Sequence, residues 1–423
     1  MQFNIENLGP IHQANIEING LTVITGQNGI GKSYLGKGLF SVVDIARENF
    51  LYIRSFLYKQ VGETIEEIIE ELKPFPSLRY IEAYLDFLPI DDFLFNRNNV
   101  REELEEHKQQ VLKEMPSEKN KLVKESFDML NMLTYAKVLN SEEFNNERFK
   151  KSFSSITNSI FKGAINNKNN KRAATKITLK DSKTNTSIKI EVENNQLTHL
   201  ETNSHFFKKV TSVESPLILT LHSFIRDSLA FNRGFNQNAD PYQGLPYHIF
   251  DLVKKISQKR FTEETQLSNE IKSIISGSLQ FDSGQDDFIY TDSNHQKHNI
   301  LNVASGIKSF GLLQLLLASN NLEKGSLLII DEPEVHLHPF WQLKYAEILI
   351  RLVEEGVLVV VTSHSPYFIE ALKTYSDKRI KDKTKFYLGE MKEKGTIFKD
   401  ATNNLEPIFE LLAEPMQLLM FDN

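Results

Sequence analysis

Eight residues near the N-terminus have the types and spacing that cradle a phosphate group. They fit the pattern G-x-x-x-x-G-K-[ST], in which glycines let successive backbone N–H groups point at phosphate oxygens. Lys32 in such a loop reaches the β and γ phosphates, and the Ser33 hydroxyl holds Mg²⁺. The pattern predicts a site for ATP and magnesium made by Gly26, Gln27, Asn28, Gly29, Ile30, Gly31, Lys32 and Ser33.

Acidic residues follow an apolar run, 326–330, much later in the chain. An unbroken apolar strand suits a parallel sheet covered on both faces, and ligands bind at the carboxyl ends of such strands. Asp331 is therefore predicted as a second Mg²⁺ anchor, directly or through water. Glu332 is the candidate general base that takes a proton from the attacking water. The alternative is an acidic helix start ahead of Pro339, which the phosphate loop disfavours.

Two further segments carry polar residues at the ends of predicted elements. His364 follows the apolar strand 357–363, and it can contact the γ phosphate if this strand neighbours the acidic one. Ser305 is predicted as the N-cap of an apolar helix, and Gly306 keeps the start of that helix open to an anion.

The elements that must position these residues give the fold class. A buried strand, 21–25, precedes the phosphate loop and an amphipathic helix, 34–46, follows it. We predict an α/β P-loop fold with a mixed sheet built from distant segments. Its other predicted elements are strands 2–7, 14–18 and 216–221, a helix over 340–355, strands near 386–388 and 396–398, and a terminal helix over 405–419.

The domain organisation follows from the positions of the motifs. We predict a discontinuous nucleotide-binding domain, 1–45 and 215–423, interrupted by a mainly helical insertion over 46–214. Helices over 65–72, 100–113 and 119–139 and a hairpin of strands 176–179 and 187–192 make up the insertion.

The order of these motifs resembles that of the ABC-type ATPases. Within them it is most similar to the bacterial AAA-like group that includes the overcoming-lysogenization-defect nucleases. The resemblance is carried by the phosphate loop Gly26–Ser33, a signature-like run Ala304–Lys308, the run Asp331–Pro339 and the triplet Thr362–His364.

This resemblance implies roles for individual residues. Glu332 is implied to be the catalytic glutamate and His364 the switch histidine, which with Lys32 make up the predicted catalytic set. Ser305 and Gly306 are implied to reach ATP held by a second copy of the chain, in a head-to-tail pair. The signature departs from Leu-Ser-Gly-Gly-Gln by carrying Ile307 and Lys308. For the Q-loop glutamine of the family, Gln60 and Gln196 remain alternatives.

The resemblance also implies a function. About 50 residues follow Tyr375, too few for the TOPRIM nuclease domain that the overcoming-lysogenization-defect nucleases carry. We therefore expect an ATP-binding and hydrolysing switch subunit that oligomerises and controls a separate effector, such as a nuclease or toxin. The similarity is to ATPase subunits of the anti-phage systems Septu and PARIS. The alternative is a RecF-like repair or recombination ATPase that binds DNA directly.

Composition limits the other possibilities. The chain has no cysteine and no apolar run long enough to span a bilayer, so we expect a cytoplasmic protein without a membrane partner. The net charge of -7 argues against broad nucleic-acid binding, and the basic segment 162–176, with Lys168, Lys171 and Arg172, favours a solvated loop. We interpret His336 and His338 as shaping a turn, since a third metal ligand with suitable spacing is not visible.

Overall fold

The computed structural model describes residues 1–79, 81, 85, 99–116, 121, 123–128, 153–167, 173–202, 207, 209–235, 245–257 and 265–421. The chain divides into two compact units. One unit is Met1–Arg47 with Ser152–Asn423, and the other is Glu48–Lys151. This division differs from the insertion predicted over 46–214, because the strands between 175 and 202 join the sheet of the first unit.

The first unit combines runs of strands with runs of helices, and in its described part strands and α-helices alternate singly only from Ser305 to Lys392. In chain order it contains β1 (Gln2–Leu8), β2 (Ile11–Glu17), β3 (Leu21–Thr25), the start of α1 (Lys32–Leu72), β4 (Thr175–Asp181), β5 (Thr186–Glu193), β6 (Gln196–Thr202), β7 (Val210–Val213), α7 (Ile218–Phe235), α8 (Tyr247–Ile256), α9 (Gln266–Ile274), β8 (Gly277–Asp282), β9 (Asp287–Asp292), β10 (Lys297–Asn299), η3 (Ile300–Asn302), α10 (Ser305–Ala318), β11 (Leu327–Asp331), η4 (Pro333–His336), α11 (Pro339–Glu354), β12 (Leu358–Ser363), α12 (Pro366–Arg379), η5 (Lys381–Lys383), β13 (Thr384–Lys392), β14 (Gly395–Asp400) and α13 (Glu406–Phe421).

Among the described residues, eleven strands form one mixed sheet in the order β6-β5-β4-β1-β2-β14-β13-β3-β12-β11-β7. The strands from β13 to β7 pair in parallel, whereas β1, β2, β4, β5 and β6 pair antiparallel with one another. A second sheet has the order β10-β9-β8. The predicted α/β fold class with a mixed sheet is confirmed. The hairpin over 176–192 is also confirmed, as are the strand before the phosphate loop and the helix after it.

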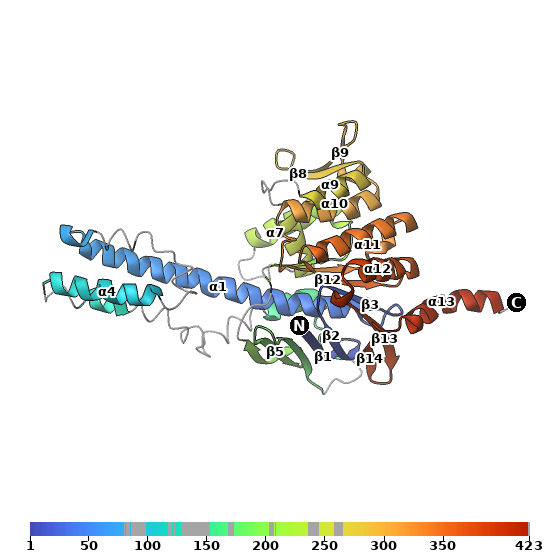
Figure 1. Ribbon diagram of the computed structural model, residues 1–423, viewed down its shortest axis with the longest axis horizontal. Coiled ribbons are helices and arrows are strands. Elements are labelled where there is room, and N and C mark those ends of the chain that lie inside the picture. The colour runs from blue at the N-terminus through green and yellow to red at the C-terminus, as the bar shows by residue number, and fades with distance from the viewer. Residues whose placement is uncertain are drawn as a thin grey trace. The chain divides into compact units, whose positions relative to one another are not determined.

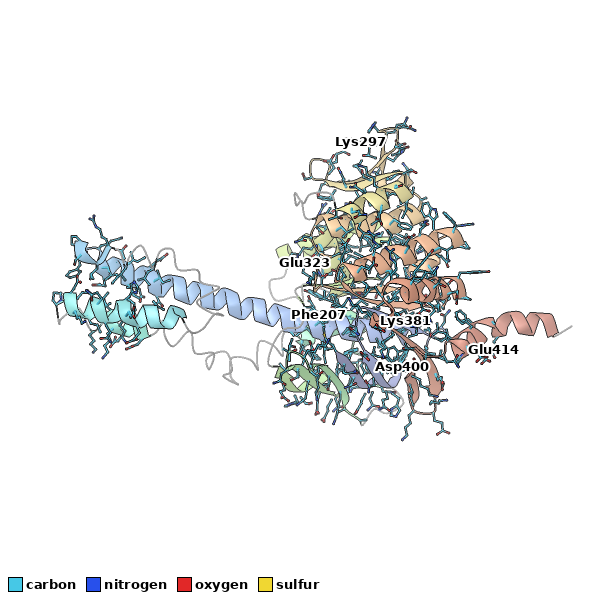
Figure 2. The ribbon with its side chains drawn as sticks, viewed as in Figure 1. Phe207, Lys297, Glu323, Lys381, Asp400 and Glu414 are labelled. Atoms are coloured by element: carbon cyan, nitrogen blue, oxygen red, sulfur yellow. The ribbon has the colours of Figure 1, made fainter. Side chains whose placement is uncertain are left out.

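The parallel strands are buried on both faces, which explains their unbroken apolar sequences. Leu328 and Val359 face a core that also contains Leu313 of α10 and Leu349 of α11. The opposite face meets α1, where Gly36 lies so close to Ile329 that an added Cβ would be 3.1 Å from it. Figure 1 shows α11 and α12 beside β12, and side chains fill the space between the sheet and these helices (Figure 2).

One predicted strand, 216–221, is wrong. The strand ends earlier, as β7 (Val210–Val213), and α7 begins at Ile218. Ser215 accepts a hydrogen bond from the backbone N–H of Leu217, and Pro216 presets a helical φ for the turn that follows. A short apolar run has no period that separates a strand from a helix, which is why the pattern was ambiguous.

The second unit is helical in the residues that are described. α1 continues into it as one helix to Leu72, so the helix predicted over 65–72 is the end of α1. It also holds η1 (Pro76–Leu78) and α4 (Asn99–Glu114). Ile68, Leu104 and Phe127 are fully buried in its core. Of the predicted helix 119–139, positions 121 and 123–128 are helical, and the rest lies outside the described residues.

No described helix is both long and apolar enough to span a membrane.

Candidate nucleotide-hydrolysis site

Three neighbouring parallel strands end at the same edge of the sheet. Thr25, the last residue of β3, pairs with Ser363 of β12, and Thr362 pairs with Asp331 at the end of β11. The phosphate loop, the acidic pair and His364 therefore leave the sheet side by side, although the loop lies about 300 residues before the other two in sequence.

The phosphate loop has the backbone that its glycines predict. Gly26 and Gly31 have φ of 139° and 102°, values that side-chain-bearing residues rarely adopt. An added Cβ on Gly26 would lie 2.2 Å from Ile30, and one on Gly31 would lie 2.8 Å from Pro10. The loop leads directly into α1, whose N-terminal N–H groups favour an anion. The residues present fit a bound triphosphate.

Lys32 is buried, with 4% of its surface exposed, and it curls back over the loop. Its Nζ donates hydrogen bonds to the carbonyl oxygens of Gly26 (3.0 Å) and Gln27 (3.1 Å). The same Nζ lies 3.3 Å from Glu332 Oε1. The structure therefore brings the two remote motifs together at the distance of an ion pair.

Glu332 adopts a left-handed backbone conformation, with φ 45° and ψ 55°. This conformation is unfavourable for a residue with a side chain, by roughly 1–2 kcal/mol. Thr362 stabilises it, because the Glu332 N–H lies 3.2 Å from Thr362 O and 3.1 Å from Thr362 Oγ1. The Thr362 hydroxyl in turn donates to Asp331 Oδ1. Thr362 thus fixes both acidic residues, a role that its place inside an apolar strand did not reveal.

His364 lies directly after β12 and faces the acidic pair. Its Nδ1 is 3.1 Å from Glu332 Oε1, and 38% of the side chain is exposed. An imidazole in this place can orient the Glu332 carboxylate while its other nitrogen remains available to a substrate oxygen.

Ser33 and Asp331 are the residues that fit magnesium. Ser33 is the second residue of α1 and is partly exposed, and Asp331 ends β11. A hydroxyl and one carboxylate suit Mg²⁺, which keeps several waters and takes its remaining ligands from phosphates. In the part of the chain that the structure describes, no three His, Cys, Asp or Glu side chains form a metal cluster. His338 has another task, because its Nδ1 accepts from the Phe340 N–H and caps α11.

Glu214 is a component of this edge that sequence reasoning missed. It follows β7, the strand next to β11, and lies 2.8 Å from Lys37 Nζ and 2.9 Å from His248 Nε2. Burial alone would raise the pKa of Glu214, but the His248 ring and the Lys37 ammonium lower it to about 2. With Asp331 and Glu332 it lines a cavity of about 20 Å³, which has room for one water molecule. The sequence prediction missed Glu214 because it put the strand at 216–221. The strand ends at Val213, and Glu214 therefore lies at the edge of the sheet where ligands bind.

A larger cavity, of about 680 Å³, lies on another side of the phosphate loop. Gln27 and Ile30 line it together with Glu410 and Glu414 of α13, the second of which Figure 2 labels. Its carboxylates disfavour a polyanion. We therefore do not assign the triphosphate to it.

The signature-like residues lie apart from the phosphate loop. Among the described residues, no hydrogen bond or ion pair joins Ser305 or Gly306 to that loop. The predicted N-cap is wrong: Ala304 is the N-cap of α10, no side chain caps the helix, and Ser305 is its exposed first residue. An added Cβ on Gly306 would lie 2.8 Å from the Trp341 ring, so this glycine permits close packing of α10 on α11.

Neither candidate for the Q-loop glutamine is placed at the site by the structure, and three residues of the basic segment lie outside the described residues. Gln196 begins β6, at the opposite edge of the sheet from β7, and is not near the acidic pair. Gln60 belongs to the second unit, and its side chain lies outside the described residues. Lys168, Lys171 and Arg172 of the basic segment also lie outside them.

The fold resembles solved SMC heads. The SMC head domain from Thermotoga maritima is 8% identical, with a TM-score of 0.39 over 94% of this chain and 97% of that chain. A Pyrococcus furiosus Smc head with an extended coiled coil, bound to the C-terminal domain of ScpA, is 11% identical, with a TM-score of 0.42 over 98% of each chain. An SmcHead bound to the C-winged helix domain of ScpA is 12% identical, with a TM-score of 0.44 over 97% of this chain and 98% of that chain.

No curated protein sequence matches the chain. A sequence model of one family, the AAA ATPase domain, matches residues 1–369, which is most of the 423 residues and includes the phosphate loop, the acidic pair and His364. The chain therefore belongs to the AAA ATPase domain family and is an ATP-binding ATPase.

Proposed function

We propose that this protein is a Mg²⁺-ATP-dependent switch that hydrolyses ATP between two copies of the chain and controls a separately encoded effector in bacterial anti-phage defence. The observation that supports hydrolysis best is the approach of two side chains to Glu332 Oε1 at one edge of the sheet, Lys32 Nζ at 3.3 Å and His364 Nδ1 at 3.1 Å. The defence role is supported by the resemblance of the motifs and not by the geometry of the site.

The residues divide the work of hydrolysis between them. The backbone N–H groups of the loop and the Lys32 ammonium bind the phosphates, and their positive charge stabilises the negative charge of the transition state. Glu332 accepts a proton from the attacking water, and His364 holds the carboxylate in place. Ser33 and Asp331 would hold Mg²⁺, which supplies charge neutralisation at the phosphate oxygens.

Ser305 is proposed to complete the site of a second copy. It is exposed at the start of α10, and this helix start has no side-chain cap, so its N–H groups can receive a phosphate oxygen. Hydrolysis would then require association, and the ATP-bound pair would be the state that an effector recognises.

Two variants test the chemistry. Glu332→Gln should retain ATP while turnover falls on the order of 100-fold or more, because the general base is removed without a change of shape. Lys32→Ala should abolish ATP binding in a titration, since the phosphates lose the one side-chain cation that the loop supplies. Glu347→Gln, a surface carboxylate on α11, is the matched control and should behave as wild type.

The outcomes separate the alternatives. Normal phosphate release by Glu332→Gln, or unchanged ATP affinity in Lys32→Ala, would contradict the proposed chemistry. Turnover that rises on addition of DNA would favour the RecF-like alternative over the effector switch. In cells that carry the gene with its neighbours, loss of phage protection in Glu332→Gln would support the defence role.

A further inference from the structure

Glu334 is a buried carboxylate that the proposed chemistry does not use. It lies in η4, two residues after Glu332, and is 3% exposed. Its Oε1 accepts three hydrogen bonds from the last residue of β12 and the two residues after it. The donors are Ser363 Oγ (2.6 Å), His364 N (3.0 Å) and Ser365 N (3.3 Å).

Burial of the Glu334 carboxylate is unfavourable for folding. Burial raises the pKa of Glu334 in spite of its three donors, and its Oε2 has no hydrogen-bond partner among the described atoms. A buried charge destabilises a fold unless donors compensate for it. Hydrogen bonds to an ionised acceptor are stronger than neutral ones, so a carboxylate fixes these donors more firmly than an amide would.

The same carboxylate is next to the His364 ring. Glu334 Oε1 lies 3.8 Å from His364 Nδ1, and Glu332 Oε1 lies 3.1 Å from that nitrogen. One carboxylate therefore binds the backbone of the histidine while the other faces its ring. The hydrogen bond to the backbone N–H thus fixes the position from which the His364 side chain leaves the strand.

Gln342 ties the same two segments together a second time. Its Nε2 donates to Leu337 O at 3.2 Å, next to η4, and its Oε1 accepts from Ser365 Oγ at 2.8 Å. Ser365 also caps α12 by accepting from the Phe368 N–H. Glu334 thus contacts all three residues of the segment Ser363–Ser365, and Gln342 adds a second contact at Ser365.

We propose that Glu334 is a positioning residue, which holds the segment Ser363–Ser365 so that His364 faces Glu332. This inference rests on the proposed function, because it assigns Glu332 and His364 to ATP hydrolysis. Glu334 itself touches neither phosphate nor water in this role. Its effect on turnover passes through His364.

The test is a double-mutant cycle with ATP turnover and ATP affinity as separate readouts. Glu334→Ala should lower kcat on the order of 100-fold, with the ATP dissociation constant within about twofold of wild type, because the phosphate loop is untouched. Glu334→Gln should recover at least about tenfold of that loss, since its amide oxygen still accepts from the two backbone N–H groups. In a His364→Ala background, Glu334→Ala should slow turnover by less than about twofold further.

The positioning role would be overturned if Glu334→Ala slowed ATP turnover by the same factor in the His364→Ala background as in the wild type. That result would leave the proposed ATPase activity intact. If Glu334→Ala does not fold, the cycle is run with Glu334→Gln, where the same result would overturn it. Wild-type turnover in His364→Ala would overturn the role as well. Failure of the proposed function is a different result, because it would show as normal turnover in Glu332→Gln.

Discussion

At the scale of single residues, Glu214 shows how the ligand edge of the sheet is stabilised. Lys37 and His248 flank its carboxylate, and the three side chains connect β7, α1 and α8. Because Lys37 lies one turn beyond Ser33, this ion pair also holds the first turns of α1, the helix that follows the phosphate loop.

The low pKa of Glu214 predicts a pH-dependent stability. A shift from 4.5 to about 2 corresponds to at most about 3 kcal/mol of folding free energy, present above pH 4.5 and lost as the pH falls toward 2. Glu214→Gln should therefore lower the urea midpoint clearly at pH 7, and its difference from wild type should shrink by pH 3. Glu347→Gln should show no such trend. A difference that is equal at both pH values would contradict the assigned ion pairs.

At the scale of elements, the contact of α10 with α11 depends on the absence of a side chain. Gly306 lies against the Trp341 ring, which also packs edge-on against Phe310 at 5.5 Å. Because α10 presents Ser305 at its start, the position of Ser305 depends on this packing.

Gly306→Ala should destabilise the protein by roughly 1–3 kcal/mol, because its Cβ would overlap the indole ring and force α10 or α11 to shift. The measurement is the midpoint of urea unfolding. Ser273→Ala on the exposed face of α9 is the control, and it should be neutral or slightly stabilising. If both variants unfold at the wild-type midpoint, the contact is looser than the structure indicates.

The elements also show what the sequence could and could not predict. The phosphate loop, β11, β12 and α11 have strong local signals, since glycine spacing and unbroken apolar runs depend on few residues. Glu214 and Thr362 could not be found in this way, because their roles arise from which strands become neighbours. The N-cap of α10 was misassigned to Ser305, since Ala304 offers no side-chain acceptor that a sequence pattern could register.

At the scale of the whole molecule, the proposed ATP site is shared between two copies of the chain. The first unit of each copy carries both parts of it, the phosphate loop and Ser305. The two parts are not joined within one chain among the described residues. Figure 1 shows α10 on the same side of the large sheet as α11 and α12. The proposed function therefore assigns Ser305 to the nucleotide of a second copy.

Ser305→Arg should block ATP-dependent association while leaving ATP binding by the monomer unchanged, because a long cation replaces a small hydroxyl where phosphate should enter. Light scattering with and without Mg²⁺-ATP, in the Glu332→Gln background, measures the association. Ser283→Arg, at the exposed turn between β8 and β9, is the matched control. A Ser305→Arg protein that pairs and hydrolyses ATP like wild type would remove Ser305 from the shared site.

The parallel register of β3, β12 and β11 has a consequence for how this chain can diversify. Backbone hydrogen bonds between the strands align their three ends. The connecting polypeptide must only bring each strand back into the same register. The second unit, Glu48–Lys151, lies between β3 and β11 in sequence and contributes no described residue to the site, so it can be lengthened, trimmed or exchanged with little effect on the aligned edge. Such changes can therefore add new binding surfaces to the protein while the residues of the proposed ATP-hydrolysis site stay the same.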